Sequence, residues 1–221
     1  MRRYLLILPL LAPLSACMDI PQAQAPRKQV VHRSTAFFNP EPEYRQCLSE
    51  LGAQHAAFTP LPDQYFGAGC SNVETVRLSR LQGDDDSFGL TNLGPVTCNV
   101  ATTFAAWARY GVDRAAEQIL GSRLARIETF GSYSCRNVAG TNRRSGHATA
   151  NAIDVSAFVL ADGRRISVLD DWNGGSPAER HFLRVVHASA CKRFGMTLGP
   201  DYNAAHANHF HVEADGGDFC R

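Results

Sequence analysis

Apolar and polar positions in the second half of this chain recur with two different periods. Residues 96–120 carry apolar side chains at helical spacing, and the pattern breaks at Gly111 and restarts after Asp113, which can cap a second helix. Residues 125–133 are rich in β-branched and aromatic side chains, which favours a strand. Residues 151–169 predict a hairpin, because two apolar runs flank an Asp-Gly turn.

The clearest predicted helix begins behind Ser176. Pro177 occupies its first position and Glu179 lies three residues after the serine cap, and the amphipathic run that follows stops before Gly195. Residues 209–213 then predict a short final strand. Because strands and helices do not alternate regularly, the pattern predicts an α+β domain with a mainly antiparallel sheet and flanking helices.

The N-terminus has the anatomy of an export signal. Two arginines precede an apolar run that is shorter than the ~20 residues of a membrane-spanning helix. The ending Leu-Ser-Ala-Cys resembles a bacterial lipobox, which implies a signal peptide at residues 1–16 and a lipid on Cys17; the alternative is an ordinary secretory signal. Met18 after the cysteine favours an outer-membrane anchor over an inner-membrane one. We therefore expect a periplasmic lipoprotein that touches the membrane only through its lipid.

The remaining chain divides into a tether and one domain. Residues 18–43 mix Pro, Gln and charge without apolar periodicity, so we expect a flexible tether there. Residues 44–221 are long enough for one domain with its own core. Without residues 1–16 the chain has 20 basic and 21 acidic residues, because the full sequence has 22 basic residues and the signal contains two arginines. This balance gives no reason to expect a nucleic-acid partner.

Six cysteines follow Cys17, and an even number in an exported chain predicts three disulfides. The sequence does not choose among the possible connectivities, and nearest-neighbour pairing is the first expectation: 47–70, 98–135 and 191–220. A zinc site made of thiolates is the competing hypothesis. It is disfavoured because no CxxC pair is present.

The stretch HANHFHVE, residues 206–213, concentrates histidines near the end of the chain. Because side chains alternate faces along a strand, His209 and His211 point the same way, while Phe210 and Val212 point into the opposite layer. The two apolar side chains can anchor the strand in the core. The pattern thus places two imidazoles on one face, which alone is weak evidence for a site.

A carboxylate and a third histidine strengthen the case. His147 lies in a loop, and Asp154 lies in an apolar strand where an unpaired carboxylate would be costly to bury. A cation would remove that cost. Two imidazoles and one carboxylate around zinc leave a fourth position open, which is typical of a catalytic site. The alternative is that Asp154 pairs with Arg143 or Arg144 and that His147 only caps a turn.

These residues resemble a known group of proteins. His147 with Asp154, followed by a final-strand His-x-His, is similar to the LAS metallopeptidases, the group of lysostaphin-type endopeptidases, zinc D-alanyl-D-alanine carboxypeptidases and the hedgehog signalling domain. The segments CRNVAGTNRRSGHATANAIDVSAF, FLRVVHASACKRFGMTLGPDYN and HANHFHVE resemble more closely the extensin-like C-terminal domain family of exported bacterial proteins. The resemblance covers roughly residues 47–220 and implies a LAS-like fold.

The resemblance implies one zinc ion and a role for each candidate residue. Its metal ligands would be His147, Asp154 and His211, and His209 and His206 would be the catalytic and transition-state-stabilising imidazoles. Arg136 falls where related peptidases place an arginine that holds a substrate carboxylate or carbonyl. Arg143 and Arg144 compete with it for that role.

Two departures from the family pattern stand out. Ala150 replaces a glycine of the usual Ser-x-His-x-x-Gly-x-Ala-x-Asp pattern, and we expect little effect from this change. Asn208 stands where related enzymes often have an acidic general base. The base must then be another residue, with His209 the first candidate and Glu213 the second.

The resemblance and the expected compartment together imply a function. We expect a zinc peptidase acting on peptidoglycan stem peptides or cross-links, as a D,D-carboxypeptidase or an endopeptidase. The main alternative is a non-catalytic, zinc-containing lipoprotein that binds the cell wall, which Asn208 keeps open. A zinc-delivery protein is a third hypothesis, and the open coordination position disfavours it.

Overall fold

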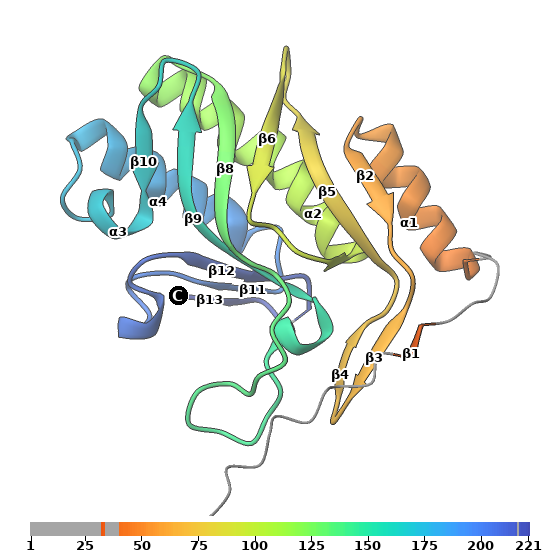
Figure 1. The fold of residues 1–221 in the computed structure, drawn as a ribbon. Helices are drawn as coiled ribbons and strands as arrows, with labels where there is room; N and C mark the ends of the chain where they lie inside the picture. Colours follow the sequence, from red (N-terminus) through yellow and green to blue (C-terminus); the bar gives the residue numbers. More distant parts are fainter. Residues whose placement is uncertain (1–31, 34–39, 216) are drawn as a thin grey trace, which may run out of the picture.

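The computed structural model describes residues 32–33, 40–215 and 217–221, and it shows an α+β arrangement with a mostly antiparallel main sheet (Figure 1). The predicted fold class and the predicted number of disulfides, three, are confirmed, whereas two of the three expected pairings are wrong. The predicted signal peptide, Cys17 and most of the predicted tether lie outside the described residues. The predicted domain boundary at residue 44 falls inside the first helix.

Within the described residues, thirteen strands form two sheets. They are β1 (His32–Arg33), β2 (Ala57–Pro60), β3 (Gln64–Gly67), β4 (Cys70–Asn72), β5 (Thr75–Gln82), β6 (Ser87–Thr91), β7 (Val96–Thr97), β8 (Leu124–Gly131), β9 (Ala152–Leu160), β10 (Arg165–Ser167), β11 (Met196–Leu198), β12 (Phe210–Glu213) and β13 (Phe219–Cys220). The main sheet has the order β13-β11-β12-β9-β8-β6-β5-β2, with β10 on β9 and β7 on β5, and the small sheet has the order β1-β3-β4. Within the main sheet only the pairs β6–β8 and β11–β13 are parallel.

The helical segments lie mainly on one side of the main sheet, with α2 and α4 behind it in Figure 1. They are α1 (Pro42–Ala53), α2 (Cys98–Trp107), the π-helical η1 (Ala108–Asp113) and η2 (Ala116–Leu120), the 3-10 turn η3 (Gly146–Thr149), α3 (Val168–Asp171), α4 (Pro177–Cys191) and the 3-10 turn η4 (Ala204–His206). The helix α1 packs against α2, and α4 packs against η1 and η2.

Trp107, at the end of α2, lies at the centre of the core. Its ring is fully buried and contacts Phe158 of β9 and Phe194 after α4 edge-on. Its indole N–H donates to the backbone oxygen of Val186 in α4, 3.2 Å away. A buried indole needs such an acceptor, so this one side chain fixes α2 relative to both the sheet and α4.

The predicted helix break at Gly111 is wrong, because the helix continues from α2 through η1. A Cβ atom at Gly111 would lie 2.3 Å from Ser189 Oγ of α4 and 3.0 Å from Trp107 Cδ1. The glycine therefore serves a close helix–helix approach. The predicted cap is also wrong: Asp113 is buried and accepts hydrogen bonds from the Leu124 backbone N–H and from Arg123.

Two of the three disulfides join cysteines that nearest-neighbour pairing did not connect. Cys191 pairs with Cys220 as expected, but the expected pairs 47–70 and 98–135 are replaced by 47–98 and 70–135. The physical reason is the packing of α1 on α2, which brings Cys47 to Cys98. The second bridge fastens β4 to the loop that follows β8.

The remaining predicted elements are confirmed. The strand β8, the hairpin of β9 and β10, and the strand β12 match the expected segments within a few residues, although β12 is not the final strand, because β13 follows it. At the start of α4 the Ser176 hydroxyl accepts from the Glu179 backbone, and the Glu179 carboxylate accepts from the Ser176 backbone. This reciprocal cap is the one that the sequence predicts.

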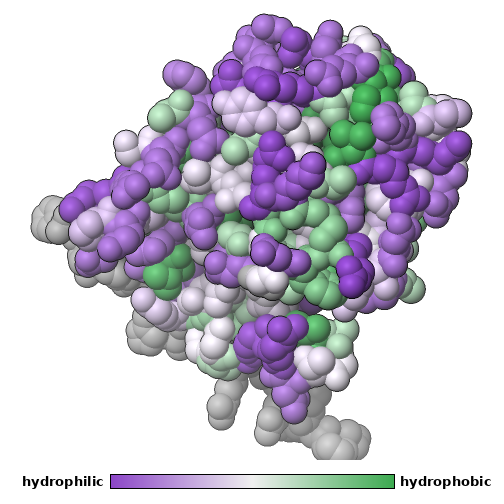
Figure 2. Space-filling model, turned by 180° about the vertical axis from the view of Figure 1, so that it is seen from behind, coloured by the Kyte–Doolittle hydropathy of each residue, from purple (hydrophilic) through white to green (hydrophobic). Residues whose placement is uncertain are grey.

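The outer face of the helical side is mixed in polarity. Seen from behind, hydrophilic side chains predominate along its edges, and hydrophobic ones form smaller patches between them (Figure 2). The helix α4 turns its apolar side inward, where Phe182, Leu183, Val186 and Ala190 are buried. Within the described part of the chain, every helix is too short or too polar to cross a membrane.

The contacts at Gly111 generate a stability prediction with a matched control. Gly111→Ala should destabilise the protein by about 1–3 kcal/mol, because the new methyl group overpacks the contact with Ser189 and Trp107. Gly52→Ala in α1 should be neutral or stabilising by up to about 1 kcal/mol, because open space surrounds that position and alanine favours helix. Thermal unfolding followed by circular dichroism measures both. An equal or higher unfolding temperature for Gly111→Ala would contradict the packing described here.

Candidate metal centre

Two neighbouring strands carry the centre of the site. The antiparallel pairing of β12 with β9 places His211 opposite Asp154, and β8 pairs on the other edge of β9 with Gly131 opposite the same aspartate. The predicted alternation of side chains along residues 209–212 is confirmed, since Phe210 and Val212 are fully buried while His209 and His211 both approach Asp154. Backbone pairing thus fixes the relative positions of the carboxylate and the imidazoles.

A short turn carries the third group. Ser145 caps η3 by accepting from the His147 backbone, and the turn ends at Ala150, whose φ of 55° is in the left-handed region. That conformation costs a non-glycine residue about 1–2 kcal/mol. Ala150 therefore lies where glycine is favoured, at the position where the expected pattern has a glycine. That the replacement has little effect on the site stays a prediction.

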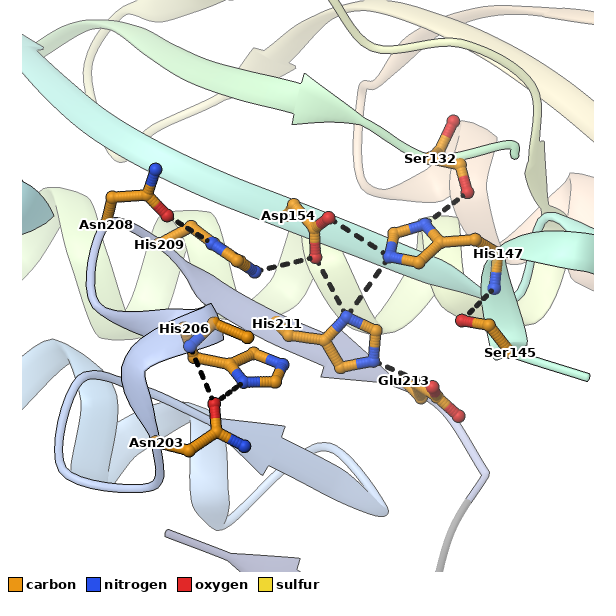
Figure 3. A network of polar contacts seen from close by, with 11 residues as sticks. Ser132, Ser145, His147, Asp154, Asn203, His206, Asn208, His209, His211 and Glu213 are labelled. Carbon is orange, nitrogen blue, oxygen red and sulfur yellow. Dashed lines mark hydrogen bonds and ion pairs between the residues drawn. The ribbon is translucent and has the colours of Figure 1, made fainter. Parts of the chain in front are cut away.

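Three ligating atoms converge between these elements (Figure 3). His147 Nε2 lies 3.1 Å from Asp154 Oδ2 and 3.2 Å from His211 Nδ1, and His211 Nδ1 lies 2.8 Å from Asp154 Oδ1. Ligand atoms of the three residues all lie within 4.8 Å of one another. Ligands about 2.0–2.1 Å from a tetrahedral zinc lie about 3.3 Å apart, so these separations fit a single small cation.

The outer nitrogen of each ring is already engaged as a donor. His147 Nδ1 lies 2.7 Å from the Ser132 carbonyl oxygen, and His211 Nε2 lies 2.7 Å from Glu213 Oε1. Both oxygens only accept, so both outer nitrogens carry the hydrogen. In neutral rings His147 Nε2 and His211 Nδ1 then present lone pairs to each other and to the Asp154 carboxylate. Three electron-rich groups directed at one point require a proton or a cation, and such outer partners are typical of metal-binding histidines.

The electrostatics of the metal-free centre follow from this crowding. Burial opposes ionisation of Asp154, but the hydrogen bonds and charges of His147 and His211 outweigh it and hold the pKa of Asp154 well below its usual range. Burial likewise opposes a charge on His211, yet Asp154 and Glu213 outweigh it and raise the pKa of His211 to about 9. Without a metal, a proton on His211 neutralises the cluster.

The two remaining histidines have the opposite tendency. Burial lowers the pKa of His209, and the positive charges of His211, His147 and Arg136 lower it further against the attraction of Asp154. Burial and the charges of His209 and His211 lower the pKa of His206 to about 4. Both rings therefore favour the neutral state, which suits proton acceptors.

The structure distinguishes the three candidate arginines. Arg144 donates to the Ala68 backbone oxygen and to Asn137 Oδ1, both at 2.7 Å, so it braces the loop. Arg136 is exposed, and its charge acts on both His206 and His209. Arg143 is exposed in the same loop. The disulfide at Cys135 adjoins Arg136 and fastens that part of the loop to β4.

Two alternatives from the sequence are contradicted by these contacts. The partners of Asp154 among the described residues are His147, His209 and His211, so the aspartate does not pair with Arg143 or Arg144. A thiolate site is excluded because all six cysteines of the described domain form disulfides. The second group of potential ligands, His187 with Cys191 and Cys220, contains one of these disulfides.

Glu213 lies behind His211, and its carboxylate binds the outer ring nitrogen. A Cβ atom on Gly146 would come within 2.6 Å of the Glu213 carboxylate, so the two pack tightly. This position supports His211 as a ligand and makes Glu213 a poor general base. The alternation of side chains in β12 already indicates that Glu213 shares a face with His211.

Other groups of the site could not be read from the sequence. The Ser132 carbonyl reaches His147 because β8 ends beside Asp154, which is a property of the fold. Asn208 and Asn203 contact His209 and His206, respectively, at 2.8 Å. The exposed Phe130 lies edge-on to the His209 ring at 5.9 Å.

The fold and the site together define an α+β domain with a His–Asp–His cluster flanked by two further histidines. Residues 45–221 match the family described as extensin-like protein C-terminus, and the chain belongs to that family. The match includes every site residue named above. Neither a curated protein nor a solved structure matches the chain.

The convergence of three ligands predicts a hierarchy of zinc affinities. His211→Ala should weaken zinc binding by more than about 100-fold, because it removes a ligand. Glu213→Gln should weaken it by about 10- to 100-fold, the range for a residue that orients a ligand. His206→Ala should leave the affinity unchanged. Isothermal titration of chelator-treated protein measures all three; equal affinities for His211→Ala and the parent would exclude this cluster as the metal site.

The raised pKa of His211 predicts that zinc binding displaces a proton. Below its pKa of about 9 the metal-free ring is protonated, so binding at neutral pH should release about one proton. Affinity should rise with pH up to about 9 and then level off. Titration in buffers of different ionisation enthalpy counts the protons. Glu213→Gln, which removes one cause of the raised pKa, should release fewer; a parent protein that releases none would refute the prediction.

Proposed function

We propose that this domain is a zinc-dependent peptidase that acts on peptidoglycan stem peptides or cross-links. The observation that carries the proposal is the convergence of His147 Nε2, the Asp154 carboxylate and His211 Nδ1, with the outer nitrogen of each ring engaged by Ser132 or Glu213. Two imidazoles and one carboxylate around one zinc ion suit a catalytic site, because the fourth position stays open.

Each of the remaining groups has a chemical role in this proposal. Zinc, when bound, supplies a Lewis acid and an activated water at neutral pH. His209 Nε2, 3.4 Å from Asp154 Oδ1, takes a proton from the attacking water and returns it to the leaving amine. His206 lies beside His209, with ring centroids 5.1 Å apart, and the charge of Arg136 acts on both rings, so these two groups would stabilise a developing oxyanion or bind a substrate carboxylate.

The choice of substrate rests on three further points. The export signal expected from the sequence leads to the periplasm, where peptidoglycan is the polymer with accessible amide bonds. The ligand pattern resembles that of the LAS metallopeptidases, which include zinc D-alanyl-D-alanine carboxypeptidases. Arg136, an exposed cation whose charge acts on His206 and His209, suits the carboxylates of stem peptides. A lipid on Cys17 would hold the domain at the outer membrane, close to this polymer.

A second function is favoured by Asn208. Related peptidases often have an acid at that position, so a domain without it fits a cell-wall-binding lipoprotein that retains zinc for its shape and binds stem peptides without cleaving them. The two functions share the metal site and differ only in turnover.

The test is digestion of purified muropeptides by the zinc-loaded protein, with products identified by mass spectrometry at several pH values. We expect loss of D-alanine or opening of cross-links. His209→Ala should retain zinc and lower kcat by about 10²–10⁴-fold, the range for general acid–base catalysis. His181→Ala is the matched control, because His181 is an exposed histidine of α4 and should leave kcat unchanged.

The outcomes separate the two functions. Absence of any cleavage by protein with a full complement of zinc would rule out the peptidase, and retained muropeptide binding would then favour the binding lipoprotein. Full activity of His209→Ala would instead show that another group transfers the proton.

A further inference from the structure

We propose that Asn208 and Asn203 are positioning residues that fix the tautomers of His209 and His206, the two imidazoles beside the metal ligands. The proposal concerns the site of the proposed peptidase and rests on that function for its chemical meaning. Its physical basis is independent, since it consists of hydrogen bonds between each asparagine and its histidine (Figure 3).

The contact of Asn203 determines the tautomer of His206. The Oδ1 atom of Asn203 accepts from the Ala205 backbone N–H at 3.0 Å, and it lies 2.8 Å from His206 Nδ1. A backbone N–H needs an oxygen acceptor, which establishes that the amide oxygen and not the amide nitrogen faces the ring. His206 Nδ1 therefore carries the hydrogen, and Nε2 of the neutral ring carries the lone pair.

The amide of Asn208 contacts its neighbouring ring at the same distance. Its Oδ1 lies 2.8 Å from His209 Nδ1, within hydrogen-bond distance. On the other side of the ring, His209 Nε2 lies 3.4 Å from Asp154 Oδ1, which is a charge contact and not a hydrogen bond among the described residues. The better hydrogen bond retains the hydrogen on Nδ1, so the Nε2 lone pair of His209 points toward the metal ligands.

An amide oxygen has a different effect from a carboxylate on an imidazole. It orients the ring and accepts its N–H, but it lacks the negative charge that would stabilise the imidazolium ion. His211, between Asp154 and Glu213, shows the contrasting arrangement with two carboxylates. Asn208 and Asn203 thus set their partners as neutral rings with a free Nε2.

This assignment changes two roles at the site. Asn208 becomes the group that prepares His209 as a proton acceptor, so its presence in place of an acid is no sign of lost activity. A neutral His206 presents an acceptor at Nε2 and has no hydrogen there to donate. The stabilising of a developing oxyanion then falls to Arg136, which is always charged.

Nuclear magnetic resonance tests the assignment directly, because long-range ¹H–¹⁵N spectra show which ring nitrogen carries the hydrogen. The zinc-loaded protein labelled with ¹⁵N-histidine is measured at about pH 8, above the ordinary histidine pKa. The signals are assigned with His206→Gln and His209→Gln. We expect Nδ1–H at both rings in the parent protein.

The variants separate the two pairs. Asn208→Leu should change the tautomer ratio of His209 by about tenfold toward Nε2–H and leave His206 unchanged, and Asn203→Leu should do the reverse. Asn208→Asp and Asn203→Asp keep the acceptor oxygen and should keep Nδ1–H. Asn99→Leu, at an exposed asparagine of α2, is the matched control and should change neither ring.

The tautomer measurements test the positioning roles of Asn208 and Asn203 independently of any enzymatic turnover. Nε2–H at both rings of the parent, or an unchanged His209 ratio in folded Asn208→Leu, would overturn it. If the tautomers change as expected and no muropeptide is cleaved, the positioning roles of Asn208 and Asn203 are supported and the proposed peptidase activity is refuted. If cleavage occurs, Asn208→Leu should lower kcat by about tenfold with KM unchanged, and Asn208→Asp should restore the Nδ1–H tautomer.

Discussion

The antiparallel pairing of β9 with β12 is the constraint on which the site depends. It places Asp154 opposite His211 in adjacent, hydrogen-bonded strands, and the buried Phe210 and Val212 prevent a shift in register. A shift by one residue would turn both imidazoles into the core and expose the apolar pair. The relative positions of Asp154 and His211 are therefore fixed mostly by the free energy gained on burying the apolar side chains between and beside them.

Much of the fold and part of the site could be predicted from local pattern. The alternation around Phe210 indicated the shared face of His209 and His211, and the cap at Ser176 indicated the start of α4. The failures involve contacts between distant segments. Gly111 was misread as a helix end because the sequence does not show that α4 crosses there.

The same limit applies inside the site. The direction of Glu213 follows from the strand period, and Asn203 contacts His206 within one short turn, but the Ser132 carbonyl reaches His147 only because β8 ends beside Asp154. A backbone oxygen carries no signature in a sequence. The cluster of His147, Asp154 and His211 could be predicted because metal chemistry restricts the residue types of candidate ligands, whereas the groups that orient them are drawn from a wider set.

Ala150 joins the turn that carries His147 to the strand that carries Asp154, and it does so in a left-handed conformation. Alanine has fewer accessible backbone states than glycine in the unfolded chain, so it loses less entropy on folding. Part of its conformational strain is thereby offset before any contact forms. Because a methyl group also restricts motion about this joint, His147 and Asp154 are held at a fixed separation, which would reduce the entropy lost on binding a cation between them.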